Sequence, residues 1–379
     1  MRVSFTKKEM RDALKKLNLM KRGDEYDKEI LLVADLKKGV LLVSRTADRV
    51  TMSVAVPALF NNEEAMRLDM SELDTALKGA VCDVGVIDAN DRGDGNFCAK
   101  FLDDADEVSL QSAIRYHVDD KHDSDVIGSI SVKGILLKVP LMRVFPVMLP
   151  RNMTNRSLMS FCRVKCEGTR LNVMGVNITA GAWASEEIYD DTGDFDCLLP
   201  YNMVLVASKS LDHDAPVSLS YGDDVVKMQF DNITMSATRN KEEFFKLQDL
   251  WDKQPTPETT AIYNAEELLA AVKRISNVVK KTKYKAISVD IQNDSTVLTA
   301  FDDNDKALGK TSIGSVLTGN PVSVRVNGEK LSKMLIPLAA SASTVKIKVT
   351  KADKPLLITL TDYVENDYRA LLAPINKRK

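Results

Sequence analysis

A helix-like segment recurs six times along this chain of 379 residues, at an interval of roughly 64 residues. Each segment carries apolar residues at helical spacing and is followed by strand-like sequence. The six segments span residues 7–22, 71–80, 133–156, 201–211, 264–285 and 327–340. A unit of one helix and one small sheet cannot bury its apolar face alone, so we expect the units to pair. The repeat therefore predicts an α+β fold of three tandem domains, each built from two helix-plus-antiparallel-sheet units.

The helices are predicted from apolar stripes at i, i+3, i+4 and i+7 spacing. These stripes comprise Met10, Ala13, Leu14 and Leu17 in the first segment, Leu268, Val272, Ile275 and Val279 in the fifth, and Leu331, Met334, Leu335 and Leu338 in the sixth. The third segment contains Pro140, Pro146 and Pro150. Because proline inside a helix costs about 3 kcal/mol, we predict a short, kinked helix that starts at Pro140.

Between the helical segments, runs of alternating or β-branched residues end at turn signals such as Lys38-Gly39, which predict antiparallel hairpins. A polar, acidic stretch at 117–128 and a proline-containing stretch at 252–258 separate the repeats in pairs. We therefore expect domains at 1–128, 129–255 and 256–379.

Charge is distributed unevenly between the helices and the rest of the chain. The six helical segments together carry a net charge of +15, whereas the whole chain carries −2, which leaves −17 for everything else. A protein that is nearly neutral overall can thus present one strongly basic face.

The sequence contains no recognisable catalytic motif. We find no phosphate-binding glycine loop, no nucleophile paired with histidine and no metal-ligand spacing, and we expect neither an enzyme nor a cofactor. Five cysteines without such spacing indicate reduced thiols, with Cys162 and Cys166 buried on one face of a strand. The sequence has no signal peptide and no apolar run that could span a membrane, which predicts a cytoplasmic protein without a membrane partner.

Basic residues recur on equivalent faces of the helical segments, which suits contact with the phosphates of duplex DNA rather than the reading of bases. The residues assigned to this DNA-binding face are Lys8, Arg11, Lys15, Arg143, Arg151, Lys209, Lys273, Arg274, Lys280, Lys281 and Lys333. The same face leaves a second hypothesis open, an open repeat scaffold that binds an acidic partner or RNA. A monomeric state without preference for circular DNA would favour that scaffold.

Three blocks carry a resemblance to a known family. SLMSFCRVKCEGTRLNVMGVNITAGAWAS (157–185), EELLAAVKRISNVVKKTKYKAISVDIQNDSTVLTA (266–300) and the closing YRALLAPI (368–375) resemble the bacterial β-type DNA sliding clamp, the processivity factor DNA polymerase III subunit beta. The resemblance extends over essentially the whole chain. It implies a head-to-tail homodimeric ring whose helices surround duplex DNA, with the replicative DNA polymerase, a clamp loader and other clamp-motif proteins as partners.

The resemblance also implies a pocket for a short linear motif of these partners. Its wall would comprise Met159, Val176, Ile178, Thr179, Phe245, Leu250, Leu371, Leu372, Pro374 and Ile375. Ring closure would involve Val108 and Leu110 on one edge and Val278 on the other. Many family members have Thr-Asp-Gly-His-Arg-Leu at 176–181 and a Phe-Pro-Asp-Tyr stretch at 244–247, and this chain has neither. These departures indicate a divergent replication system such as that of a phage or plasmid.

Overall fold

The computed structural model describes residues 1–20, 28–91, 97–104, 106–116, 125–188, 193–361 and 367–375. The chain folds into two compact units. Unit 1 comprises Met1–Ile135 and Leu199–Lys241, and unit 2 comprises Leu136–Leu198 and Glu242–Lys379. Residues 129–255 contribute to both units, so the three domain limits stay a prediction.

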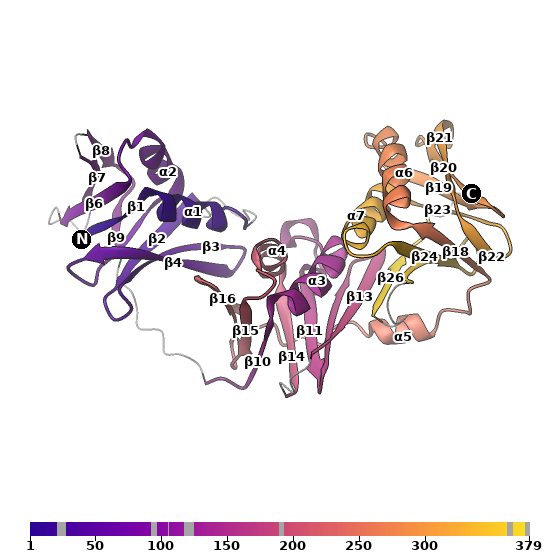
Figure 1. The fold of residues 1–379 in the computed structure, drawn as a ribbon, viewed down its shortest axis with the longest axis horizontal. Coiled ribbons are helices and arrows are strands. Elements are labelled where there is room, and N and C mark those ends of the chain that lie inside the picture. Colours follow the sequence, from indigo (N-terminus) through magenta and orange to yellow (C-terminus); the bar gives the residue numbers. More distant parts are fainter. Residues whose placement is uncertain are drawn as a thin grey trace. The chain divides into compact units, whose positions relative to one another are not determined.

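Among its described residues, unit 1 contains three helices and an antiparallel sheet of 13 strands. Figure 1 labels these helices and most of the strands. The helices are α1 (Lys7–Leu17), α2 (Met70–Gly79) and α4 (Tyr201–Ser210). The strands are β1 (Arg2–Thr6), β2 (Glu29–Asp35), β3 (Val40–Ala47), β4 (Val50–Phe60), β5 (Ala65–Asp69), β6 (Val84–Asp91), β7 (Phe97–Asp103), β8 (Asp106–Leu110), β9 (Ile114–Tyr116), β10 (Gly128–Lys133), β15 (Pro216–Tyr221), β16 (Val225–Phe230) and β17 (Ile233–Thr238).

The sheet of unit 1 joins strands from distant parts of the chain. Its main path runs β10-β15-β16-β17-β4-β1-β6-β7-β8, and Met235 of β17 lies opposite Met52 of β4. Helix α1 packs against β3 and β4 and against α2. Strand β8 ends this path, so one of its edges has no partner strand among the described residues.

Unit 2 has helices and two antiparallel sheets. The helices are α3 (Gly134–Val144), α5 (Leu247–Asp252), α6 (Ala265–Val278) and α7 (Gly328–Ala339), with short 3-10 turns at Phe145–Val147, Arg151–Met153 and Ser157–Ser160. The strands are β11 (Phe161–Glu167), β12 (Arg170–Val176), β13 (Ala180–Glu187), β14 (Phe195–Pro200), β18 (Thr259–Asn264), β19 (Ala286–Ile291), β20 (Ser295–Phe301), β21 (Ala307–Gly314), β22 (Val316–Gly319), β23 (Val322–Asn327), β24 (Thr344–Val349), β25 (Leu356–Leu360) and β26 (Tyr368–Leu372).

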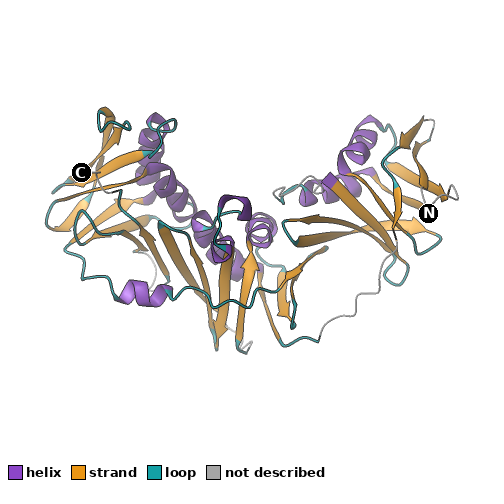
Figure 2. Cartoon of the chain, turned by 180° about the vertical axis from the view of Figure 1, so that it is seen from behind, coloured by secondary structure: helices purple, strands orange, loops and turns teal. Residues whose placement is uncertain are grey.

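The larger sheet of unit 2 has the order β14-β11-β12-β13-β26-β25-β24-β18-β22, and the smaller has the order β21-β20-β19-β23. The closing strand β26 pairs with β13, where Leu371 lies opposite Gly181. Helices α6 and α7 lie side by side on one side of the strands, apart from the short α5 (Figure 2). Strand β21 ends the smaller sheet with one edge unpaired among the described strands.

The expected helix-plus-meander units are confirmed, and so are their buried stripes. All twelve stripe residues of the first, fifth and sixth segments are buried. The side chains of Thr6, Asp69, Asn264 and Asn327 cap α1, α2, α6 and α7 by accepting a backbone N–H of the first turn. Cys162 and Cys166 lie buried on β11 as predicted. The structure thus follows the hydrophobic pattern closely where that pattern is periodic.

The prediction of a helix starting at Pro140 is wrong. Helix α3 begins at Gly134 and contains Pro140 in its interior. Leu137, Leu141 and Val144 are each fully buried, and this packing outweighs the hydrogen bond that proline cannot donate. The helix nevertheless ends at Val144, where the next prolines begin the 3-10 turns. Helix α5 is too short and too weakly periodic for the sequence to have predicted it.

Candidate functional site

Helix α1 presents cations on the side opposite its buried stripe. Lys8 and Lys15 are exposed and Arg11 is half-buried. Lys15 Nζ lies 3.0 Å from Asp12 Oδ1, and this hydrogen bond lowers the pKa of Asp12. Lys16 instead donates to Asn232 Oδ1 at 2.8 Å, so it ties α1 to the β16–β17 turn. Among the described residues, Lys8 and Arg11 therefore form no ion pair, whereas Lys15 shares its charge with Asp12.

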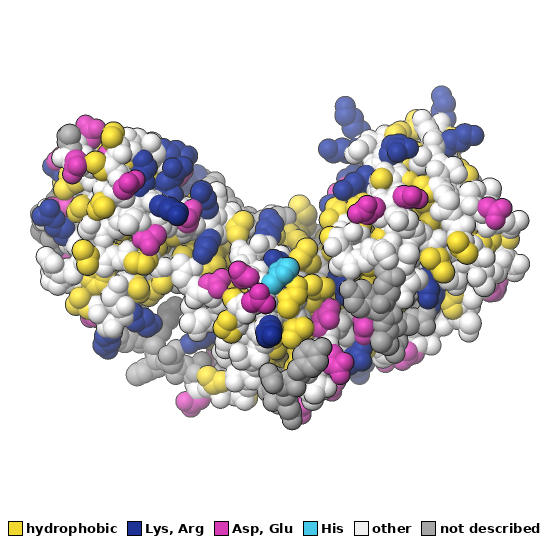
Figure 3. All heavy atoms as spheres, viewed as in Figure 1, with side chains coloured by type: hydrophobic (Ala, Val, Ile, Leu, Met, Phe, Trp, Pro, Cys, Tyr) yellow, Lys and Arg dark blue, Asp and Glu magenta, His cyan; other side chains and the backbone are white. Residues whose placement is uncertain are grey.

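Helix α6 repeats this arrangement in unit 2. Lys273 and Arg274 are exposed on the helix, and Lys280 and Lys281 are exposed just beyond its last residue, Val278. Arg274 Nη1 donates to Thr311 Oγ1 of β21 at 3.3 Å. Lys and Arg side chains gather near α1 in unit 1 and near α6 and β21 in unit 2 (Figure 3). Each unit thus has a basic helical surface of its own.

The remaining helices contribute fewer free cations. Arg151 and Lys209 are exposed, and their assignment to a binding face stays a prediction. Arg143 is a correction, because its side chain is buried within unit 2 with 1% of the residue exposed. Its guanidinium donates to Glu186 Oε1 at 3.4 Å and to Ser341 Oγ at 3.3 Å. A buried arginine with these partners supports the packing of its own unit and does not offer its charge to DNA.

Lys333 is exposed but shares its charge with a carboxylate. Its Nζ lies 2.6 Å from Glu329 Oε1, and Lys285 binds the other oxygen of the same carboxylate. These two hydrogen bonds lower the pKa of Glu329 to about 2. The cluster fixes the first turn of α7 to the chain before β19, so Lys333 contributes less to a basic surface than its exposure suggests.

The Glu329 cluster predicts a defined dependence of stability on acid. The pKa of Glu329 falls from its ordinary 4.5 to about 2 on folding, so its stabilisation is complete above pH 4.5 and disappears as pH falls through about 2. Solvent screens this half-exposed group, so Glu329→Gln should cost about 1 kcal/mol or less at pH 7. Urea unfolding between pH 7 and pH 2 should show that the free energies of unfolding of the wild type and of Glu329→Gln become equal in acid. Glu266→Gln, at an exposed glutamate in the first turn of α6, is the matched control, and an equal loss in both variants would contradict the cluster's role.

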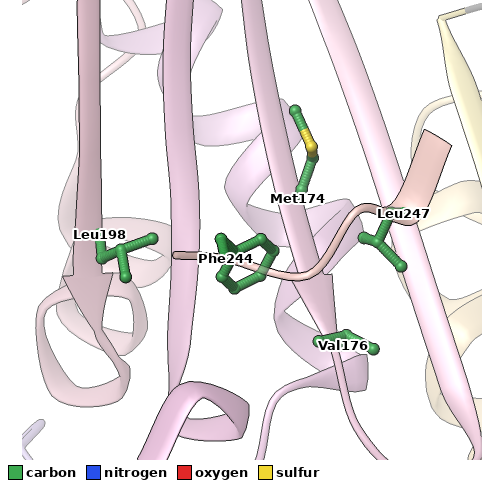
Figure 4. Close-up of a cluster of buried hydrophobic side chains, with 5 residues drawn as sticks. All are labelled: Met174, Val176, Leu198, Phe244 and Leu247. Atoms are coloured by element: carbon green, nitrogen blue, oxygen red, sulfur yellow. The ribbon is translucent and has the colours of Figure 1, made fainter. Parts of the chain in front are cut away.

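The predicted partner pocket divides into a buried part and an exposed part. Val176 belongs to a hydrophobic cluster that also contains Met174, Leu198, Phe244 and Leu247 (Figure 4). Met159, Leu371 and Leu372 are buried too. In contrast, Ile178 is 73% exposed and Leu250 is 48% exposed, while Thr179, Phe245, Pro374 and Ile375 are half-buried. The segment before α5 thus covers β12 with its own apolar side chains.

Gly181 on β13 makes this packing possible. A Cβ at that position would lie 3.1 Å from Leu247 Cδ2, which is tighter than an ordinary contact. Phe244 stacks edge-on against Phe245, with ring centroids 5.8 Å apart. Sequence reasoning identified Phe245 but missed Phe244 and Leu247, because Phe244 lies in the irregular segment before α5, where no periodic pattern marks it.

The loop that carries Ile178 is held by several hydrogen bonds. Thr179 N donates to Asn177 Oδ1 at 2.9 Å, and Ala373 N donates to Thr179 O at 2.7 Å. Lys330 Nζ donates to Thr179 Oγ1, and burial lowers the pKa of Lys330. Sequence reasoning missed Lys330, which has no local pattern to mark it. The exposed Ile178 therefore stands on a well-anchored loop.

A cavity of about 400 Å³ opens beside the end of the described chain. It is lined by Ser288, Asp290, Phe301, Ser323, Arg325, Ala352, Asp353 and Ile375. Ile375 N donates to Arg325 O at 2.7 Å, which fixes this end of the chain to β23. Ile375 is thus both a predicted wall residue and part of this cavity's lining.

The residues predicted for ring closure lie on β8, an end strand of its sheet, and on α6, the helix that packs against the end strand β21. Val108 on β8 is 42% exposed, and Val278 at the end of α6 is 45% exposed. Leu110 is only 2% exposed because it lies opposite the buried Ala99 of β7 in its own sheet. It can support the edge strand but offers no free surface. Leu308 of β21, which is 44% exposed, was not predicted.

Three solved structures that are similar to this chain are beta subunits of bacterial DNA polymerase III, one of them a putative one. A DNA polymerase III subunit beta sliding clamp from Pseudomonas aeruginosa matches with 13% identity and a TM-score of 0.81, over 100% of both chains. A putative DNA polymerase III beta subunit from Eubacterium rectale matches with 14% identity and a TM-score of 0.82, over 99% of both chains. The beta subunit from Thermotoga maritima matches with 14% identity and a TM-score of 0.79, over 100% of both chains.

A scan against protein-family models finds no match, and a search of curated protein sequences finds none either. The class of structure is nevertheless defined by the full-length agreement. This chain has the fold of the bacterial DNA polymerase III beta sliding clamps, as the sequence resemblance implied. Among the described residues, no helix is both long and apolar enough to cross a membrane.

Proposed function

We propose that this chain is a DNA sliding clamp, a replication processivity factor that encircles duplex DNA and tethers a replicative polymerase. The observation that carries the proposal is the full-length agreement in fold, with TM-scores near 0.8 to beta sliding clamps. The exposed cations on α1 and α6 support it, because basic side chains on helices suit sequence-independent contact with phosphates. On this proposal the protein acts in the cytoplasm, without catalysis of its own.

The tether works by topology rather than by strong binding. Phosphate contacts made by Lys8, Lys15 and Lys273 are individually weak and read no base, so they permit sliding along the duplex. Persistence comes from closure of the ring around the DNA. The proposed ring is a head-to-tail homodimer of three-domain subunits, with limits near 1–128, 129–255 and 256–379. A symmetric dimer fits because each subunit supplies both kinds of edge.

The proposed partners are a clamp loader, a replicative polymerase and other proteins that carry a short clamp-binding motif. We assign motif binding to the exposed part of the predicted pocket, around Ile178, Phe245, Leu250 and Ile375. Val176 and Met159 are buried, and we assign them to the packed floor of the pocket. This division would restrict the peptide to the surface that the segment before α5 leaves uncovered.

Mass and DNA topology test the proposal together. The protein should run as a dimer of twice 42.0 kDa. Once loaded, it should remain on a nicked circular duplex and run off a linear duplex of the same sequence. Equal loss from circular and linear DNA, or a stable monomer, would overturn the proposal and favour the open scaffold.

A further inference from the structure

Strand β8 of unit 1 and strand β21 of unit 2 are each the end strand of a sheet, and they carry opposite charge. The exposed residues of β8 are Asp106, Glu107, Val108 and Ser109, with a net charge of −2. The edge formed by β21 carries Lys310, and Arg274 of α6 reaches across to Thr311 of the same strand. One edge is therefore acidic and the other is basic, and each has an exposed valine beside it.

Strand alternation places these charges on matching faces. Val108 lies opposite the buried Phe101 of β7, so Asp106, Val108 and Leu110 point to the helix-bearing face of the unit 1 sheet. Glu107 points to the other face. On β21, Thr311 points toward α6 because Arg274 contacts it, and Lys310 points away.

If β8 of one copy paired edge to edge with β21 of another, the helix-bearing faces of the two sheets would lie on the same side of the joined sheet. On the helix-bearing face, Asp106 and Val108 would meet Arg274 and Val278, which are one helical turn apart on α6. On the outer face, Glu107 would meet Lys310. Each unpaired edge would also gain the backbone hydrogen bonds that an edge strand lacks.

The acidic residues near the β21 edge and the lysine near the β8 edge already have partners within their own units. In the turn before β21, Asp303 accepts from the Lys283 and Tyr284 amides, and Asp305 pairs with Arg325. Beside β8, Lys100 pairs with Glu107 at 2.5 Å and offsets part of its charge. Among the described residues, Arg274, Lys310 and Asp106 form no ion pair, so their charges remain available at the two edges.

We propose that the charge polarity of these edges, acidic on β8 and basic on β21 with α6, selects a second copy of this chain in head-to-tail orientation. The proposal rests on the homodimer of the proposed function and adds the chemistry that specifies its seam. Each dimer contains two such seams, because each copy supplies one acidic and one basic edge. Like charges placed opposite one another at an interface suppress the wrong pairing.

Two variants with reversed edges test the proposal. The β8 variant carries Asp106→Lys and Glu107→Lys, and the β21 variant carries Arg274→Glu and Lys310→Glu. All four side chains are exposed, so we expect both variants to fold. Each alone would form two repulsive seams, and its dimer dissociation constant should rise at least about 100-fold in low salt.

An equimolar mixture of the two variants should restore the dimer. In the mixed dimer one seam joins two reversed edges and the other joins two native edges, so both are attractive. A chain with all four substitutions should also dimerise like the wild type and shows that the substitutions do not prevent folding. Analytical ultracentrifugation at 50 mM and 500 mM salt measures each case, and salt should weaken the wild-type dimer by screening.

The outcomes separate this proposal from the clamp itself. Variants that dimerise as tightly as the wild type would overturn the charge polarity while leaving the clamp intact, and Lys310 would then serve only to protect a free edge from aggregation. Variants that dissociate but are not rescued by mixing would likewise overturn head-to-tail recognition. A wild-type monomer would overturn the homodimer of the proposed function as well.

Discussion

Replacing Lys8, Arg11, Lys15 and Lys273 by glutamate is expected to reduce the affinity for duplex DNA at least about 100-fold at 50 mM salt. Lys8, Lys15 and Lys273 are exposed and Arg11 is half-buried, so the change acts on surface potential rather than on the core. The slope of log affinity against log salt should also fall by about 0.9 for each phosphate that is no longer neutralised. Fluorescence anisotropy with a labelled duplex of arbitrary sequence, over a series of salt concentrations, measures both quantities. Arg274 is left unchanged because it contacts the β21 edge.

A matched variant controls for net charge. Lys37 and Lys38 lie in the turn between β2 and β3, and Lys351 and Lys354 lie between β24 and β25, all of them exposed. Their replacement by glutamate makes the same change in charge away from the helices. We expect the DNA affinity of this control to fall less than about tenfold, because only the overall electrostatic potential of the protein changes. Equal losses in the two variants would show that the helices have no special role in DNA contact.

Phe244→Ala is expected to lower the free energy of unfolding by about 3–5 kcal/mol, the usual cost of removing a buried phenyl ring. Phe244 is 5% exposed and packs with Met174, Val176, Leu198 and Leu247 (Figure 4). Its loss would leave a cavity where the segment before α5 meets β12. Urea unfolding followed by circular dichroism and by tryptophan fluorescence measures the change.

Phe245→Ala is the matched control for the phenyl ring. Phe245 is half-buried at the edge of the same cluster, so its removal should cost about 1 kcal/mol, mainly because less apolar surface is buried on folding. A small, equal cost for both variants would mean that Phe244 does not fill a closed core. A large loss of unfolding free energy for Phe245→Ala alone would mean that Phe245, and not Phe244, belongs to the buried floor of the pocket.

The fold could be predicted where a pattern is local and periodic. The stripes of α1, α6 and α7 each have every predicted residue buried. Helix α3 could not be predicted in this way, because Pro140 weakens the helix locally and only the burial of Leu137 and Leu141 compensates. That burial depends on neighbours distant in sequence.

The candidate site was harder to predict than the fold, for the same reason. Nothing adjacent to Arg143 in the sequence indicates that Glu186 and Ser341 would bind it and remove it from the surface. Likewise Lys330 reaches Thr179 across 151 residues. The spacing of residues in the sequence predicts which cations an amphipathic helix exposes, but it does not predict ion pairs that form through tertiary contacts.

Topological linkage is the central claim, and trapping by ligation tests it without a loader. The protein is first allowed to thread onto a linear duplex with cohesive ends, and the DNA is then ligated into a circle. After gel filtration in 500 mM salt, which removes protein held by charge alone, the circle is cut at a single restriction site. A sliding clamp should remain with the circle and be released by the cut. Protein that leaves the uncut circle, or that stays on the DNA after cutting, would contradict the account.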